Sequence, residues 1–116
     1  MGPHWGKSLA IDLHGCSDKQ LTDAAGLKAF IGDLVKAVDM IAHGECIIDR
    51  FGIGDLKGYS AMQFIETSSI TVHLDEKGKR AFIDIFSCKD FDTEKAKKLS
   101  KEYFGAKTIK STTLLR

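Results

Sequence analysis

Apolar and polar residues alternate over residues 7–14, which is the period of a strand with one buried face. From residue 23 to residue 42 the period changes to that of a helix. We expect Thr22 or Asp23 to cap this helix and Gly44 to stop it. Its predicted inner stripe consists of Leu27, Phe30, Ile31, Leu34, Val35, Val38 and Ile41.

The rest of the pattern predicts further strands and a second helix. Asp-Glu-Lys-Gly at residues 75–78 separates two runs rich in β-branched and aromatic residues, which predicts a hairpin. Asp92 or Thr93 would cap the second helix, and Gly105 would end it. The predicted ranges are 45–51 and 59–67 for two single strands, 69–74 and 79–88 for the hairpin arms, and 107–115 for the last strand.

The order of these elements predicts the fold class. With the hairpin counted as one unit, the order is β-α-β-β-β-α-β, which favours an α+β fold. We expect a two-layer sandwich in which two helices cover one face of a mainly antiparallel sheet. Residues 1–116 have the length of a single domain. The glycine-rich segment 52–58 is expected to turn a corner, because no phosphate-loop lysine and serine follow it.

Charge and cysteine usage narrow the classes of function that the chain can have. Seventeen basic and sixteen acidic residues leave a net charge of +1, which does not suggest binding to nucleic acid or to an anionic membrane. Cys16, Cys46 and Cys88 are far apart and the four histidines lack paired spacing, so we expect no metal site. The sparse cysteines, and the lack of an export signal or an apolar run of about 20 residues, predict a cytoplasmic protein with reduced thiols.

The candidate chemistry lies around residue 68. The serine pair Ser68 and Ser69 precedes a β-branched run that ends at His73. A hairpin turn centred on residue 77 or 78 would put Cys88 opposite Thr67 or Ser68. Side chains directly opposite on one face lie about 5 Å apart. The predicted register therefore places a thiol beside the serine pair.

Such residues suit a chain that cuts itself to make a pyruvoyl group. A serine hydroxyl attacks the preceding carbonyl, the amide becomes an ester, and elimination and hydrolysis leave a ketone at the new N-terminus. That ketone forms a Schiff base with a substrate amine and withdraws electrons while carbon dioxide departs. His73 can move the proton during processing, and Cys88 can protonate the product. Alternatively, these are ordinary polar residues of a strand, and Cys88 is a small buried hydrophobe.

At these residues the chain resembles the small prokaryotic S-adenosylmethionine decarboxylases. Their cleavage motif Ser-Glu-Ser-His-(Leu/Ile)-(Thr/Ser)-Ile-His corresponds to residues 66–73, and their Ala-x-Ile-Asp-x-Phe-(Thr/Ser)-Cys to residues 81–88. The resemblance implies cleavage between Thr67 and Ser68, into fragments 1–67 and 68–116. Ser68 would then be the precursor of the pyruvoyl group.

The resemblance also implies roles for other residues. It makes His73 the processing histidine, Ser60 a second processing residue and Cys88 the proton donor. In a straight strand Ser60 and Ser68 would lie about 26 Å apart, so the chain must bend or reverse if they share a site. The family further implies a homodimer of processed protomers, in which sites are often shared across the interface.

Several positions depart from the family pattern. Thr67 replaces the usual glutamate before the cut, and Ser69 replaces the usual histidine after it, so Ser69 stays open as the precursor. Leu-Asp-Glu-Lys at residues 74–77 replaces the usual Thr-Trp-Pro-Glu, whose aromatic and acid help to hold the nucleoside. Asp75 and Glu76 would suit a cationic substrate side chain. Phe51 is a third candidate contact for the substrate.

Three functions follow from this pattern. The first, slightly preferred, is a pyruvoyl-dependent decarboxylase of arginine or ornithine in polyamine biosynthesis. The second is a decarboxylase of S-adenosylmethionine, which makes the aminopropyl donor for spermidine. The third is an unprocessed homologue without enzyme activity.

Overall fold

The computed structural model describes residues 3–116. Its elements alternate as strands, helices and one 3-10 turn. Their bounds are β1 (Lys7–His14), α1 (Asp18–Leu21), α2 (Ala24–Ala37), β2 (Ala42–Phe51), η1 (Gly54–Leu56), β3 (Gly58–Ile65), β4 (Ser68–Asp75), β5 (Arg80–Ser87), α3 (Thr93–Phe104) and β6 (Thr108–Leu115). The predicted order is confirmed, with the hairpin supplying β4 and β5 and with α1 and η1 added.

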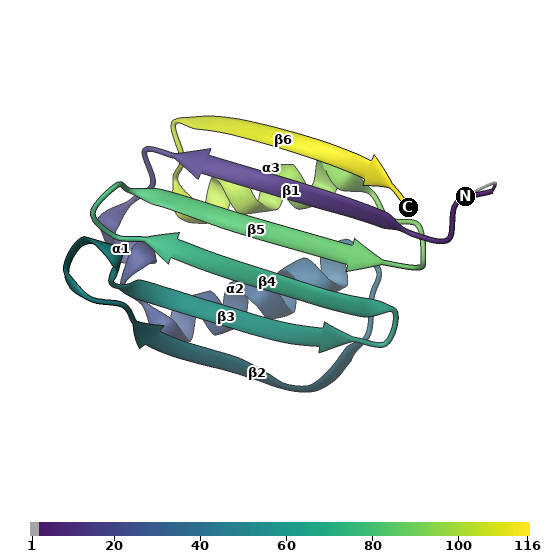
Figure 1. Ribbon diagram of the computed structural model, residues 1–116, viewed down its shortest axis with the longest axis horizontal. Coiled ribbons are helices and arrows are strands. Elements are labelled where there is room, and N and C mark those ends of the chain that lie inside the picture. The colour runs from purple at the N-terminus through teal and green to yellow at the C-terminus, as the bar shows by residue number, and fades with distance from the viewer. Residues whose placement is uncertain (1–2) are drawn as a thin grey trace.

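The strands form one antiparallel sheet in the order β2-β3-β4-β5-β1-β6. Helices α2 and α3 lie behind the sheet in Figure 1, on one of its faces, and the other face is left open. The expected α+β fold with two layers is therefore confirmed. Among the described residues, no helix is long and apolar enough to cross a membrane.

The core lies between the sheet and the helices because each strand turns one face toward α2 and α3. β1, β4 and β5 alternate between buried residues and more exposed ones along most of their length. Burying one leucine, isoleucine or phenylalanine contributes about 1.5–3 kcal/mol, so this layer is the main stabilising element. The largest fully buried side chains are Phe30, Phe104, Leu9, Ile11, Leu13, Leu21, Leu27, Ile31, Leu34, Ile70, Ile83 and Ile85.

Helix α2 is shorter than the periodicity predicts. It ends at Ala37, because Asp39 adopts a left-handed conformation with φ of 58°. The amide of Met40 then donates to the carbonyl of Val35 (2.9 Å), which closes the helix end. The prediction of a helix to residue 42 with Gly44 as its stop was wrong, since periodicity alone does not reveal a left-handed aspartate.

Helix α3 follows the prediction closely. The carboxylate of Asp92 accepts hydrogen bonds from the amides of Glu94 and Lys95, and Gly105 closes the helix with φ of 60°. These caps satisfy amide and carbonyl groups that the helix itself leaves unpaired. They fix where the chain leaves β5 and where it enters β6.

The two ends of the sheet carry different turns. The end at the right of Figure 1 holds the β3–β4 turn, the end of β5 and the start of β1. The opposite end holds the loop around η1 and the β4–β5 turn. Candidate residues lie at both ends.

Candidate functional site

The predicted cleavage point lies in the tight turn between β3 and β4. Ile65 and Ser68 are paired, so only Glu66 and Thr67 lie between the strands. Ser68 has a φ of 153°, outside the regions that L residues normally occupy. Such a backbone stores on the order of 1–3 kcal/mol of strain and persists only when neighbouring contacts hold it.

Contacts from the end of β5 hold this turn. Ser68 pairs with Ser87, which places Cys88 opposite Thr67 and confirms one of the two predicted registers. The amide of Cys88 donates to the carbonyl of Thr67 (3.0 Å), and the Ser87 hydroxyl donates to Thr67 Oγ1 (2.8 Å). The carbonyl at the predicted cleavage point is therefore held by a backbone donor.

Strand alternation separates the two serines. Ser68 falls on the helix-facing side of β4 with Ile70, and Ser69 falls on the open side with Thr71 and His73. Ser68 is thus directly opposite the buried Ser87, while Ser69 is opposite Phe86. Both serines are half-buried.

Ser60 and His73 form a second pair at the other end of β4. They are direct neighbours across β3 and β4, and Ser60 Oγ lies 2.9 Å from His73 Nδ1. The chain does reverse between Ser60 and Ser68, as the strand length required. His73 nevertheless lies five residues along β4 from Ser68, about 16 Å at 3.3 Å per residue. Within one chain the Ser60–His73 pair and the turn at Ser68 therefore do not form one site.

The Ser60–His73 pair borders two hollows. One, of about 230 Å³, is lined by Ile47, Asp49, Phe51, Ser60, Ala61, Met62, Thr71 and His73. The other, of about 480 Å³, is lined by Asp55, Leu56, His73, Leu74, Asp75, Lys77, Gly78, Arg80 and Phe82. Phe51, predicted as a substrate contact, therefore adjoins both processing candidates, and Phe82 adds an aromatic ring that the sequence did not single out.

A family model described as S-adenosylmethionine decarboxylase matches residues 7–116. Two relatives from Clostridium botulinum, each named S-adenosylmethionine decarboxylase proenzyme, are 30% (strain Langeland) and 31% (strain Loch Maree) identical over 112 residues, covering 96% of this chain and 93% of theirs. The chain belongs to the S-adenosylmethionine decarboxylase family.

The fold agrees with this assignment. The crystal structure of the adenosylmethionine decarboxylase from Aquifex aeolicus VF5 superposes with a TM-score of 0.79 at 17% identity, over 97% of this chain and 91% of that one. Enzymes of the S-adenosylmethionine decarboxylase family are pyruvoyl-dependent decarboxylases whose pyruvoyl group comes from a serine by self-cleavage. The enzyme class and the cofactor expected from the sequence are therefore confirmed.

The turn at Ser68 fits a family member that makes its own pyruvoyl group. A strained serine follows a carbonyl that already accepts a hydrogen bond from Cys88, and Ser68 is half-buried. Cys88 carries a free thiol, and its amide contacts this turn. Burial raises the pKa of Cys16 to about 11 and also raises the pKa of Cys46.

The two acids expected to bind a cationic substrate are already paired. Asp75 accepts from the amide of Gly78 (3.0 Å) and from Arg80 Nε (2.7 Å), and these contacts hold its pKa below the usual range. Glu76 accepts two hydrogen bonds from Arg50 (2.8 and 2.7 Å), which lower its pKa. Both carboxylates therefore already have an arginine of this chain as a partner.

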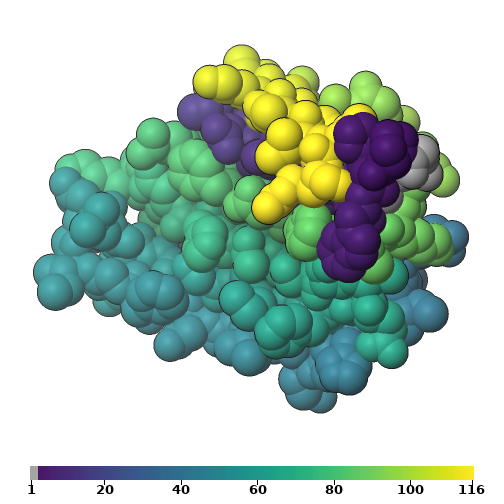
Figure 2. Space-filling model, turned by 45° about the vertical axis from the view of Figure 1, so that its right-hand side comes forward, coloured from purple at the N-terminus to yellow at the C-terminus, as the bar shows by residue number. Residues whose placement is uncertain are grey.

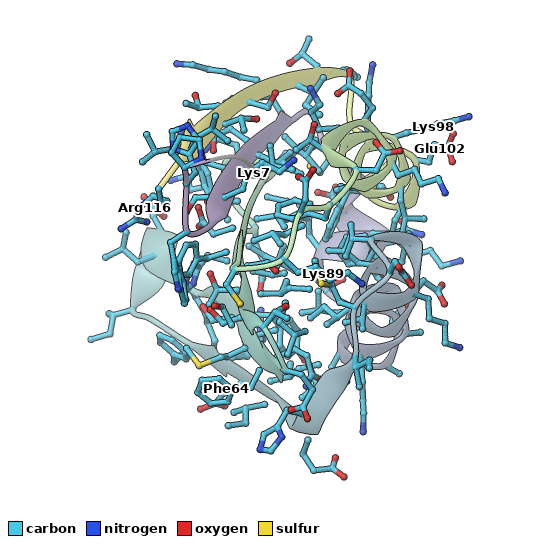
Figure 3. All side chains as sticks on the ribbon, turned by 90° about the vertical axis from the view of Figure 1, so that its right-hand side faces the viewer. Lys7, Phe64, Lys89, Lys98, Glu102 and Arg116 are labelled. Atoms are coloured by element: carbon cyan, nitrogen blue, oxygen red, sulfur yellow. The ribbon has the colours of Figure 1, made fainter. Side chains whose placement is uncertain are left out.

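Two further residues at the Cys88 end were missed by the sequence analysis. Ser87 is fully buried, and Lys7 reaches from β1 to Asp90 (2.6 Å) and to the carbonyl of Phe91 (2.7 Å). Figure 3 looks onto this end and shows Lys7 directed toward the segment that follows β5. The pairing of β1 with β5 brings Lys7 there, which the local sequence does not indicate.

Proposed function

We propose that the chain cuts itself between Thr67 and Ser68 and then decarboxylates S-adenosylmethionine. The observation that carries the proposal is the hydrogen bond from the Cys88 amide to the Thr67 carbonyl, next to a serine with a φ of 153°. The fragments would be residues 1–67 and 68–116. Together they would form one domain, because β3 and β4 stay paired on both sides of the cut.

Self-cleavage would follow from the chain's own atoms. Ser68 Oγ attacks the carbonyl carbon of Thr67, the C–N bond breaks, and the proton from the hydroxyl passes to the Ser68 nitrogen, which leaves an ester and a free amine. The Cys88 amide would stabilise the negative oxygen of the tetrahedral state. Loss of the Ser68 α-proton then expels the Thr67 carboxylate, and water replaces the nitrogen as ammonia to leave the ketone.

A homodimer would complete the processing site. The open face of the sheet carries Ser60 and His73, which lie too far from Ser68 of the same chain to move its protons. The same face of β3 exposes the apolar side chains of Met62 and Phe64. If two open faces meet, Ser60 and His73 of one copy can approach the Thr67–Ser68 peptide of the other from the open side of its β4.

The processed serine supplies a carbonyl that binds the substrate amine and accepts electrons as carbon dioxide leaves. Cys88 follows β5 beside the same turn, and its thiol would give a proton to the carbon that loses carbon dioxide. Its side chain is half-buried, so it can reach a bound substrate.

The structure around His73 favours S-adenosylmethionine over arginine or ornithine. Asp75 and Glu76, the reason for preferring a basic amino acid, are both bound to arginines. Phe51 and Phe82 line the two hollows beside His73, and flat aromatic surfaces suit an adenine ring. Both the family and these rings support the sulfonium substrate.

Intact-protein mass spectrometry tests this function. The wild-type chain should appear as two fragments split at Ser68, and sodium cyanoborohydride should trap S-adenosylmethionine on the C-terminal fragment. Trapping of arginine or ornithine instead would overturn the substrate. Ser68→Ala should stay uncut, with Ser69→Ala as the matched control; cleavage in the first and not the second would move the precursor to Ser69.

Mixed dimers test the shared site. Ser68→Ala and His73→Ala chains, each uncut alone, are co-expressed with different tags. If the partner supplies His73, the His73→Ala chain should be cut, because it keeps Ser68 and meets a partner with His73 intact. A mixture that stays uncut although the two chains co-purify would contradict the shared site.

A further inference from the structure

The residue before the cut is held by a directional chain of hydrogen bonds. The amide of Lys89 donates to Ser87 Oγ (2.9 Å), the Ser87 hydroxyl donates to Thr67 Oγ1 (2.8 Å), and the Thr67 hydroxyl donates to Met40 Sδ (3.3 Å). Ser87 Oγ also lies 3.7 Å from Met40 Sδ, a longer contact. The nearer acceptor of the Ser87 hydroxyl is therefore Thr67 Oγ1, and the Thr67 hydroxyl is directed at Met40 Sδ.

The location of Ser87 makes this chain specific to the turn. Its side chain is fully buried and lies directly across the strand pair from Ser68. The neighbouring Cys88 amide holds the carbonyl of the same Thr67. Ser87 and Cys88, which are consecutive in the chain, thus hydrogen-bond to the side chain of Thr67 and to its carbonyl, respectively. Lys89, labelled in Figure 3, continues the segment and anchors it to Asp39 after α2 (2.8 Å).

We propose that Ser87 is a positioning residue for self-cleavage, which acts through the hydroxyl of Thr67. This inference rests on the proposed function and deepens it. A two-residue turn with a strained serine relaxes unless it is held, and relaxation would rotate the Thr67 carbonyl away from Ser68 Oγ. The hydrogen bond between the buried Ser87 hydroxyl and the half-buried Thr67 hydroxyl resists that rotation. It does so at the position where a threonine replaces the glutamate of the cleavage motif.

The pair acts before the cut and not after it. Once the bond is broken, Thr67 ends one fragment and its carbonyl takes no part in turnover. Loss of the pair should therefore slow processing and leave the kcat of the processed fraction unchanged. If Ser87 were merely structural, its loss would lower both the cleavage rate and the kcat, or neither of them.

The test measures the half-time of cleavage after cell-free synthesis, by intact mass. Ser87→Ala and Thr67→Val should each slow cleavage roughly tenfold, the factor that corresponds to a hydrogen bond of about 1.4 kcal/mol. Thr67→Ser, which keeps the hydroxyl, should restore most of the rate. The double variant should be no slower than either single one, because both remove the same interaction.

Ser100→Ala is the matched control, since Ser100 is equally buried but bonds only to the carbonyl of Ala96 within α3. It should be cut at the wild-type rate. If Ser87→Ala and Thr67→Val are both cut at the wild-type rate, the positioning role is overturned while the proposed function stands. A wild-type chain that is never cut would overturn the proposed function together with it. If Ser87→Ala does not fold, the contrast of Thr67→Val with Thr67→Ser decides.

Discussion

At the scale of the residue, Cys88 contributes two separate groups to the site. Its backbone amide holds the Thr67 carbonyl, and its thiol is the candidate proton donor. A substitution of the side chain removes the thiol and keeps the amide. The two roles can therefore be separated in one variant.

We predict that Cys88→Ala is cut at a rate close to that of the wild type, because the amide donor is unchanged. Decarboxylation by the processed protein should fall by about 100-fold or more, the usual loss when a general acid is removed. Intact mass follows the first quantity, and release of labelled carbon dioxide follows the second. Cys46→Ala on β2 serves as the control. Normal turnover by Cys88→Ala would assign proton donation to another group.

At the scale of the element, ion pairs fasten the β4–β5 turn and the loop around η1. Arg80 binds Asp75 within the hairpin, Arg50 of β2 binds Glu76, and Lys77 binds Asp55 of the loop (2.7 Å). Solvent screening keeps the contribution of each exposed pair small. The pairs hold the loop against the hairpin that lines the larger hollow.

These pairs predict how stability depends on pH. Asp75 and Glu76 have pKa values lowered by folding, so they stabilise the fold above the unfolded carboxyl pKa of about 4. That contribution is lost as the pH falls through the lower, folded pKa values. Between pH 6 and pH 3 the free energy of unfolding should therefore fall less in Asp75→Asn/Glu76→Gln than in the parent.

Urea unfolding of the uncut Ser68→Ala chain at fixed protein concentration measures this difference. Asp33→Asn, on the exposed side of α2, is the control. An equal loss of stability in the parent and in the double variant would mean that the two ion pairs do not contribute in solution.

The cap of α3 gives a second prediction for an element. Asp92 accepts from two amides at the start of the helix. Asp92→Ala should lower the free energy of unfolding by about 1 kcal/mol, whereas Asp92→Asn should cost less because it keeps an acceptor. Urea unfolding in the same uncut background measures both. Equal losses in the two variants would point to charge rather than to the hydrogen bonds.

At the scale of the whole molecule, α2 and α3 cover one face of the sheet and leave the other face open. Figure 2 shows part of this face, with the N-terminal and C-terminal segments side by side at one edge. The amide of Trp5 and the carbonyl of Arg116 are hydrogen-bonded there (2.6 Å). The Ser60–His73 pair lies on the same face, so its accessibility depends on what covers the sheet.

Met62→Lys places a charge on this face beside the Ser60–His73 pair, where Met62 is 41% exposed. We predict that the variant becomes a monomer and stays uncut, because the partner's processing pair is lost. Light scattering after size exclusion measures the mass, and intact mass measures cleavage. Ile53→Lys in the loop, where Ile53 is 90% exposed, should change neither. A cut monomer would contradict the shared site.

The sequence predicted most elements, because their signals are local. Alternation marked β1, the Asp92 cap and Gly105 marked α3, and the turn at residues 75–78 set the pairing that puts Cys88 opposite Thr67. The predicted range of helix α2 is too long because the left-handed Asp39 leaves no sequence signal. The short helix α1 and the turn η1 were missed because each spans fewer than five residues.

The family, the enzyme class and the fold were determined by the sequence, since motifs and hydrophobic periods are properties of the chain itself. Three features required tertiary structure. The distance between Ser68 and His73 depends on the antiparallel reversal. The pairing of Glu76 with Arg50 joins the β4–β5 turn to β2, 26 residues away along the chain. The hydrogen bond from Ser87 to Thr67 depends on burial and register together, which no local pattern specifies.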